Sequence, residues 1–227
     1  MTSPSRRASP TALTSSFIGL ALVLAVLVAG LAITAAPAWS AAETRVVAAV
    51  GAAHNPLLDA LCQMIDAVFG PAGAPILGIL LLAWALLLTG TWRGALRAGL
   101  LLVVPWMVAQ GMKFVVRRPR PEHGALIRTI VPAPLTSSYP SGHTAFAAAL
   151  VCAFVLSLAT ARARTAAAAV GGVVVLAVAW SRVYLGVHYP TDVVASIVLV
   201  LAIALPLDAV LTRMGPLRVD TPARVTA

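Results

Sequence analysis

Long apolar runs separated by short polar segments fill most of the chain. A helix that crosses a bilayer needs about 20 mostly apolar residues, and six runs reach this length. They cover residues 17–36, 71–89, 95–113, 143–161, 166–185 and 193–211. The pattern predicts an all-α fold, a polytopic membrane bundle of six transmembrane helices.

The composition strengthens this prediction. Hydrophobic residues make up 60% of the chain and charged residues 10%, whereas a soluble domain is about 25% charged. These values exclude an ordinary soluble enzyme, a disordered chain and a disulfide scaffold. The net charge is +9, but the basic residues lie between the apolar runs, next to lipid head groups. We therefore expect the lipid bilayer as a partner and no nucleic acid.

The domain organisation follows from the runs. Residues 13–211 form the predicted six-span domain, with tails at 1–12 and 212–227. The positive-inside rule places both tails in the cytoplasm and a second basic cluster on the extracytoplasmic face of the plasma membrane. The first run resembles a cleaved signal peptide in outline. Its 20 residues exceed the usual signal core of about 7–15, so we expect a retained helix.

Segment 44–70 mixes apolar and acidic positions. Asp59 and Asp66 fall outside its apolar stripe, which recurs at helical spacing: Leu57, Leu58, Leu61, Met64, Ile65 and Val68. The spacing predicts an amphipathic helix at the outer membrane surface. Such a helix either packs against the bundle or guides a substrate.

The first polar group ends the third run. Lys113 is followed six residues later by Arg120 and Pro121, and Pro119 lies between them. The prolines favour extended backbone at the residues before them. Arg120 therefore folds back over Lys113, so that a guanidinium and an ammonium converge on one anion, a pair that suits phosphate. A basic anchor for lipid head groups is the alternative.

The second polar group, Pro140-Ser141-Gly142-His143, opens the fourth run. Ser141 is a predicted N-cap, so the backbone N–H groups of Gly142 and His143 remain free to bind an anion. Gly142 permits a close backbone approach to that ligand, and His143 faces it. A plain helix cap with an interfacial histidine is the alternative.

The third polar group crosses from the fifth run to the sixth. Ser181 and Arg182 are followed by His188 and, after Pro190, by Asp192. Pro190 suits the first position of a helix, so the Asp192 carboxylate can reach back to one nitrogen of His188. The other nitrogen is then free to attack or to accept a proton.

Together the three groups place cations, a helix N-terminus, two histidines and one carboxylate on one membrane face. This set can bind a phosphoryl group, attack it and protonate its leaving group. No cluster of acidic residues is available to hold Mg²⁺. The sequence therefore predicts phosphoryl transfer without a metal or other cofactor.

The three groups resemble the signature of the type 2 phosphatidic acid phosphatase superfamily. Lys-x6-Arg-Pro, Pro-Ser-Gly-His and Ser-Arg-x5-His-x3-Asp stand intact and in order between residues 113 and 192. The resemblance implies that His188 is the nucleophile, forming a phosphohistidine, that Asp192 orients it, and that His143 is the general acid. It also implies which residues hold the phosphoryl oxygens: Lys113, Arg120, Ser141, Gly142 and Arg182.

Four nearby residues match no motif position. We expect Arg117 and Arg118 to contact the lipid head group at most, and His54 and His123 to be structural or surface residues.

The predicted function is hydrolysis of a lipid phosphomonoester or diphosphate. Candidate substrates are a polyprenyl diphosphate such as undecaprenyl diphosphate, which an outward-facing site favours, phosphatidylglycerol phosphate and phosphatidic acid. The alternatives are an enzyme like the vanadium-dependent haloperoxidases, which resemble this signature but are soluble, and a non-catalytic protein that binds or transports lipid phosphates. The oligomeric state is not predicted.

Overall fold

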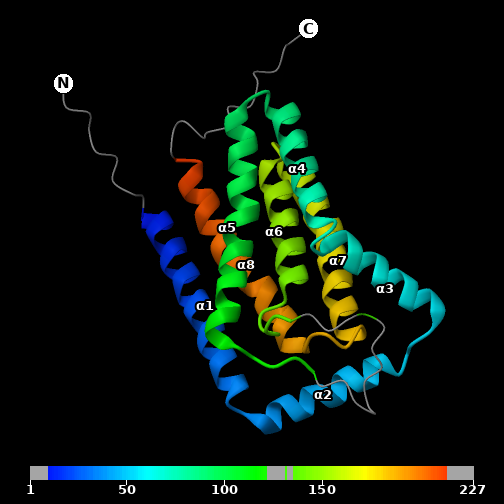
Figure 1. Cartoon of the computed structure of the whole chain (residues 1–227). Helices are drawn as coiled ribbons and strands as arrows, with labels where there is room; N and C mark the ends of the chain where they lie inside the picture. The colour runs from blue at the N-terminus through cyan, green and yellow to red at the C-terminus, as the bar shows by residue number, and fades with distance from the viewer. Residues whose placement is uncertain (1–9, 122–130, 132–134, 214–227) are drawn as a thin grey trace, which may run out of the picture.

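The computed structural model describes residues 10–121, 131 and 135–213, and every regular element in this part of the chain is a helix (Figure 1). The helices, in chain order, are α1 (Pro10–Thr34), α2 (Pro37–Gly51), α3 (Pro56–Phe69), α4 (Ala74–Thr89), α5 (Trp92–Val116), α6 (Gly142–Ser157), α7 (Ala161–Tyr184) and α8 (Pro190–Leu211). The all-α prediction is confirmed. The first helix begins at Pro10, slightly before the predicted domain start at residue 13, and most of both predicted tails lies outside the described residues.

Helix α6 is the centre of the bundle and packs against α5, α7 and α8, while α1 packs along α8. Small side chains allow these close contacts. A Cβ added to Gly171 of α7 would lie 2.4 Å from Val151 Cγ1 of α6, so the α6–α7 approach requires a glycine. The buried face of α6 is alanine-rich: Ala145, Ala147, Ala148, Ala149 and Ala153.

Each predicted span corresponds to a helix, but not all of these helices have the length of a span. Among the described residues, α1, α5, α7 and α8 are long and apolar enough to cross a membrane. A fifth candidate is the pair α3 and α4, which is bent by 60°. Helix α6 has 16 residues, about 24 Å at 1.5 Å per residue, against an apolar thickness of about 30 Å. The chain is a multi-pass membrane protein, and the count of six spans stays a prediction.

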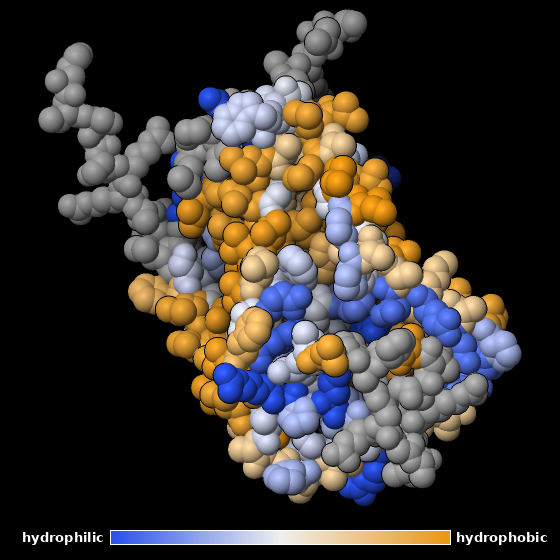
Figure 2. Space-filling model, in the orientation of Figure 1, coloured by the Kyte–Doolittle hydropathy of each residue, from blue (hydrophilic) through white to orange (hydrophobic). Residues whose placement is uncertain are grey.

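The bundle has two chemically different ends. Helix α1 begins and α8 ends at the upper end in Figure 1, while α5 and α7 end and α6 and α8 begin at the lower end. Hydrophilic side chains gather at this lower end, below a band of hydrophobic ones (Figure 2). At the opposite end, a pair that the sequence did not indicate, Arg97 of α5 with Asp208 of α8, joins the two helices.

Segment 44–70 forms two helices rather than the single predicted amphipathic helix. The break follows Gly51, and the side chain of Asn55 caps the next helix by accepting from the Leu58 N–H, with Pro56 in the first turn. One face of α3 packs against α7 through the buried Cys62. Part of the stripe stays exposed, at Leu57, Leu61, Met64 and Val68. The helix therefore packs against the bundle and still has an exposed apolar face.

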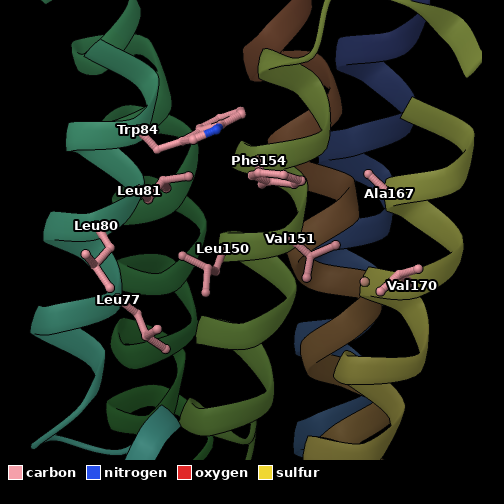
Figure 3. A pocket seen from close by; sticks show the side chains of 10 residues that line it. Leu77, Leu80, Leu81, Trp84, Leu150, Val151, Phe154, Ala167 and Val170 are labelled. Atoms are coloured by element: carbon pink, nitrogen blue, oxygen red, sulfur yellow. The ribbon is translucent and has the colours of Figure 1, made fainter. Parts of the chain in front are cut away.

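An apolar cavity of about 380 Å³ lies between α4, α6 and α7. Figure 3 shows Leu77 and Trp84 of α4 facing Leu150 and Phe154 of α6 across it. The ring centroids of Trp84 and Phe154 lie 4.4 Å apart. None of the predicted site residues lines this cavity.

Candidate active site

His188 and Asp192 meet where α7 gives way to α8. Gly186 adopts the left-handed conformation (φ 71°), and Pro190 begins α8 as predicted. Asp192 Oδ2 lies 3.3 Å from His188 Nδ1 and accepts the Tyr189 N–H at 2.9 Å. Both side chains are buried. The predicted histidine–carboxylate pair is therefore present, with Nε2 of His188 pointing away from the carboxylate.

Arg118 anchors this pair from the other side. Its Nη1 donates to Asp192 Oδ1 at 2.7 Å, and its Nη2 donates to Glu43 Oε2 of α2, also at 2.7 Å. The guanidinium also stacks over the Tyr189 ring, 4.0 Å from its centroid. The expectation that Arg118 contacts only head groups is wrong, because its side chain is 1% exposed. Its neighbour Arg117 is exposed.

Lys113 and Arg120 converge as the sequence predicts. Helix α5 ends at Val116, and left-handed Arg117 (φ 50°) turns the chain before the prolines. Lys113 Nζ donates to the Ser137 carbonyl at 2.8 Å, and Arg120 Nη2 reaches the same oxygen at 3.4 Å. Arg120 Nη1 lies 3.1 Å from His188 Nε2. Arg120 thus lies beside the His188 nitrogen that does not face Asp192, and Lys113 shares the Ser137 carbonyl with Arg120.

Ser141 is the N-cap of α6, as the sequence predicts. Ser141 accepts the Thr144 N–H at 3.5 Å and the Thr144 hydroxyl at 3.1 Å, and its own N–H donates to the Asp192 carbonyl at 3.2 Å. The bond from the Ser141 N–H to the Asp192 carbonyl ties the start of α6 to the first turn of α8. A Cβ on Gly142 would lie 3.2 Å from Gln110 Oε1, so glycine keeps the backbone close to the cavity.

His143 and Arg182 share a partner that the motifs do not include. Asp66 Oδ1 of α3 lies 2.6 Å from Arg182 Nη1 and 3.1 Å from His143 Nε2. The sequence places Asp66 off the apolar stripe of its helix, and this position is the sequence feature that could have indicated a role for Asp66 in the site. The other off-stripe acid, Asp59, pairs with the Nδ1 atom of His54 at 2.7 Å, away from these residues.

A cavity of about 770 Å³ opens onto the assembled residues. Its polar end is lined by Asp66, Lys113, Arg120, His143, Arg182 and His188. Its remaining wall is largely apolar, from α4, α5 and α6, and includes Pro75, Leu102, Trp106, Phe114 and Phe146. The cavity can hold a charged head group at one end and part of an acyl or prenyl chain along the other.

The charges around His188 set its protonation. Burial, and then the nearby cations Arg120 and Lys113, hold the pKa of His188 well below its ordinary value. Burial also lowers the pKa of Arg120 to about 10, so this guanidinium stays charged near neutral pH. In a neutral His188 with Nδ1–H toward Asp192, Nε2 carries the lone pair that a nucleophilic imidazole uses, and Arg120 Nη1 lies 3.1 Å from it.

The two histidines outside the motifs, His54 and His123, are expected from the sequence to be structural or surface residues. His54 is a buried partner of Asp59, in line with a structural role, and His123 lies outside the described residues. Within residues 10–121 and 135–213 no three His, Cys, Asp or Glu side chains gather as a metal site.

Comparison with known proteins places the chain in a family. The sequence profile of the PAP2 superfamily matches residues 80–214, more than half of the chain and all of the motif positions. The chain belongs to this superfamily, and it is a membrane lipid phosphatase.

Two relatives from Bacillus subtilis give more detail. The undecaprenyl-diphosphatase BcrC of strain 168 is 29% identical over 153 residues, which cover 66% of this chain and 73% of that protein. The crystal structure of a transmembrane PAP2-type phosphatidylglycerolphosphate phosphatase superposes with a TM-score of 0.75 at 23% identity. The match covers 87% of this chain and 98% of that one. This structural match shows a shared fold.

Proposed function

We propose that the protein hydrolyses a lipid phosphate through a phosphohistidine on His188, without a metal, and that a polyprenyl diphosphate is the first candidate substrate. One observation carries the proposal. Buried His188 lines a cavity with cations at one end and apolar side chains along the other, and its Nε2 lies 3.1 Å from one of these cations, at Arg120 Nη1. The similarity to an undecaprenyl-diphosphatase supports the choice of substrate.

In the first step, His188 Nε2 attacks the phosphorus atom and the bond to the leaving oxygen breaks. Asp192 holds the Nδ1–H, so the positive charge that develops on the ring is stabilised. Lys113, Arg120 and Arg182 neutralise the phosphoryl oxygens, together with the free N–H groups at the start of α6. Protonated His143 gives its proton to the leaving oxygen.

In the second step, water attacks the phosphohistidine and the N–P bond breaks. Neutral His143 takes one proton from this water, and the hydroxide oxygen joins the phosphorus. Phosphate then leaves, and both histidines return to their initial protonation states. Every proton is accounted for by side chains of the site, so the cycle needs no cofactor.

The site belongs on the extracytoplasmic face in this proposal. It lies at the end of the bundle opposite the start of α1 and the end of α8, and the positive-inside rule assigns those ends to the cytoplasm. A site facing outward suits the recycling of a lipid carrier, which is why the polyprenyl diphosphate ranks before phosphatidylglycerol phosphate and phosphatidic acid.

The test is phosphate release by the detergent-purified protein in excess EDTA. The three lipids are offered side by side, with His188→Ala as the inactive variant and His54→Ala as a matched control outside the site. We expect release in EDTA from at least one lipid, fastest from undecaprenyl diphosphate, loss in His188→Ala and retention in His54→Ala. Release that stops in EDTA would contradict the metal-free mechanism. Binding without release would favour a transport or binding protein.

A further inference from the structure

The carboxylate of Asp66 lies against two residues of the proposed phosphate site, Arg182 and His143. A single atom, Oδ1, lies 2.6 Å from Arg182 Nη1 and 3.1 Å from His143 Nε2. In the proposed function, these two groups contact the substrate, one through a phosphoryl oxygen and the other through the leaving oxygen. The same carboxylate oxygen contacts both.

Asp66 and a bound phosphate compete for Arg182. The Arg182 side chain is 1% exposed, and its Nη1 already donates to Asp66 Oδ1. Arginine binds phosphate best through two adjacent N–H groups. A phosphate that bridges Nη1 and Nη2 would displace Asp66 Oδ1 from Nη1, because two anionic oxygens do not share that position.

We propose that Asp66 is a competing carboxylate, an internal anion that fills part of the phosphate subsite until the substrate displaces it. The proposal rests on the proposed function. The Asp66 side chain is 33% exposed at the cavity, so it has room to swing away. Its helix ends at Phe69, and the C-cap residue Gly70 lies close to His143, because a Cβ there would lie 2.9 Å from Nε2.

The exchange has consequences for both partners. His143 Nε2 lies 3.1 Å from Asp66 Oδ1 but makes no hydrogen bond to the described residues, so it is available to the leaving oxygen once phosphate displaces the carboxylate. Competition from Asp66 also weakens the binding of every anion by the same factor. A terminal phosphate carries about two negative charges near neutral pH, whereas the phosphodiesters of bulk lipids carry one. The doubly charged group can therefore still displace Asp66, while the abundant singly charged head groups leave Asp66 in place.

The test measures binding of inorganic phosphate to the intact, detergent-purified protein by calorimetry. If the site is open in about 10–20% of wild-type molecules, removing the competitor tightens phosphate binding about five- to tenfold. We expect this gain in Asp66→Asn and in Asp66→Ala. Asp59→Asn removes the same charge from the same helix away from the site, so we expect a change of less than about twofold.

A second measurement separates competition from a structural role. In Asp66→Ala, formate should enter the vacated space and weaken phosphate binding again, while formate leaves the wild type unchanged. Unchanged or weaker phosphate binding in both folded Asp66 variants would overturn the competing carboxylate alone. A wild type and variants that all fail to bind phosphate would overturn the proposed function as well. Thermal unfolding of each variant identifies any loss of the fold.

Discussion

Arg118→Met is the substitution that most directly tests how the site is held together. The guanidinium donates to Asp192 and Glu43, each at 2.7 Å, and to the Thr191 hydroxyl at 2.8 Å. Methionine fills much of the same volume but donates nothing. The substitution leaves two buried carboxylates without their shared cation, one of them the partner of the nucleophile.

The expected cost follows from burial. Breaking a buried ion pair by removing one partner costs about 3–5 kcal/mol, because an uncompensated charge remains in a low-dielectric site. Arg118 and Asp192 are 1% and 0% exposed, so solvent screening gives little relief. We expect Arg118→Met to lower the free energy of unfolding by about 3–5 kcal/mol. Because Asp192 then loses its orientation, kcat falls too.

Denaturant unfolding in mixed micelles at neutral pH measures this change, with kcat measured on the same samples. Arg117→Met is the matched control: the side chain is exposed and donates to the Phe114 carbonyl on its own helix, so its change should stay within about 0.5 kcal/mol. Adding Glu43→Gln to Arg118→Met should recover part of the loss, since it removes one of the stranded charges. A loss below about 1 kcal/mol for Arg118→Met would refute the reasoning.

Three further results are expected. His143→Ala should slow hydrolysis of poor leaving groups by about 10²–10⁴-fold and spare good ones, and equal losses for both would contradict its role as the acid. Gly30→Ala should lower the melting temperature, because the new Cβ would lie 2.5 Å from Tyr139 Cε1; Gly172→Ala, which meets nothing within 4 Å, should not. Because the pKa of His188 is well below 6.5, His188 stays neutral as the pH falls through that value. The acid limb of kcat/KM should therefore lie below pH 6.5, and a half-loss at or above it would argue against His188.

The sequence predicts the parts of the site that sit in short contiguous motifs. Ser141 caps α6 and Pro190 opens α8 as expected, because helix starts are set by local backbone chemistry. The pairing of His188 with Asp192 follows from the same local geometry, since the two lie one turn apart. Lys113 and Arg120 converge because the chain turns at Arg117 and stays extended through the prolines.

The residues that the sequence misses come from distant helices. Glu43 reaches Arg118 from α2, and Asp66 reaches Arg182 from α3, across 75 and 116 positions of sequence. A single sequence does not state which arginine meets which acidic residue of a distant helix, because tertiary packing decides this. The same limit applies to the span count, since α6 begins at Gly142, after the buried N-cap Ser141, and has 16 residues.

The most direct test of the account is to trap the phosphorylated enzyme. Purified protein is mixed with a lipid phosphate labelled at its terminal phosphorus, quenched rapidly with alkali and digested for mass spectrometry. We predict a phosphoryl group on His188 that is stable in alkali, released by mild acid, and absent from His188→Ala. Turnover with no such adduct, or a label on another side chain, would contradict the assignment of His188 as the nucleophile.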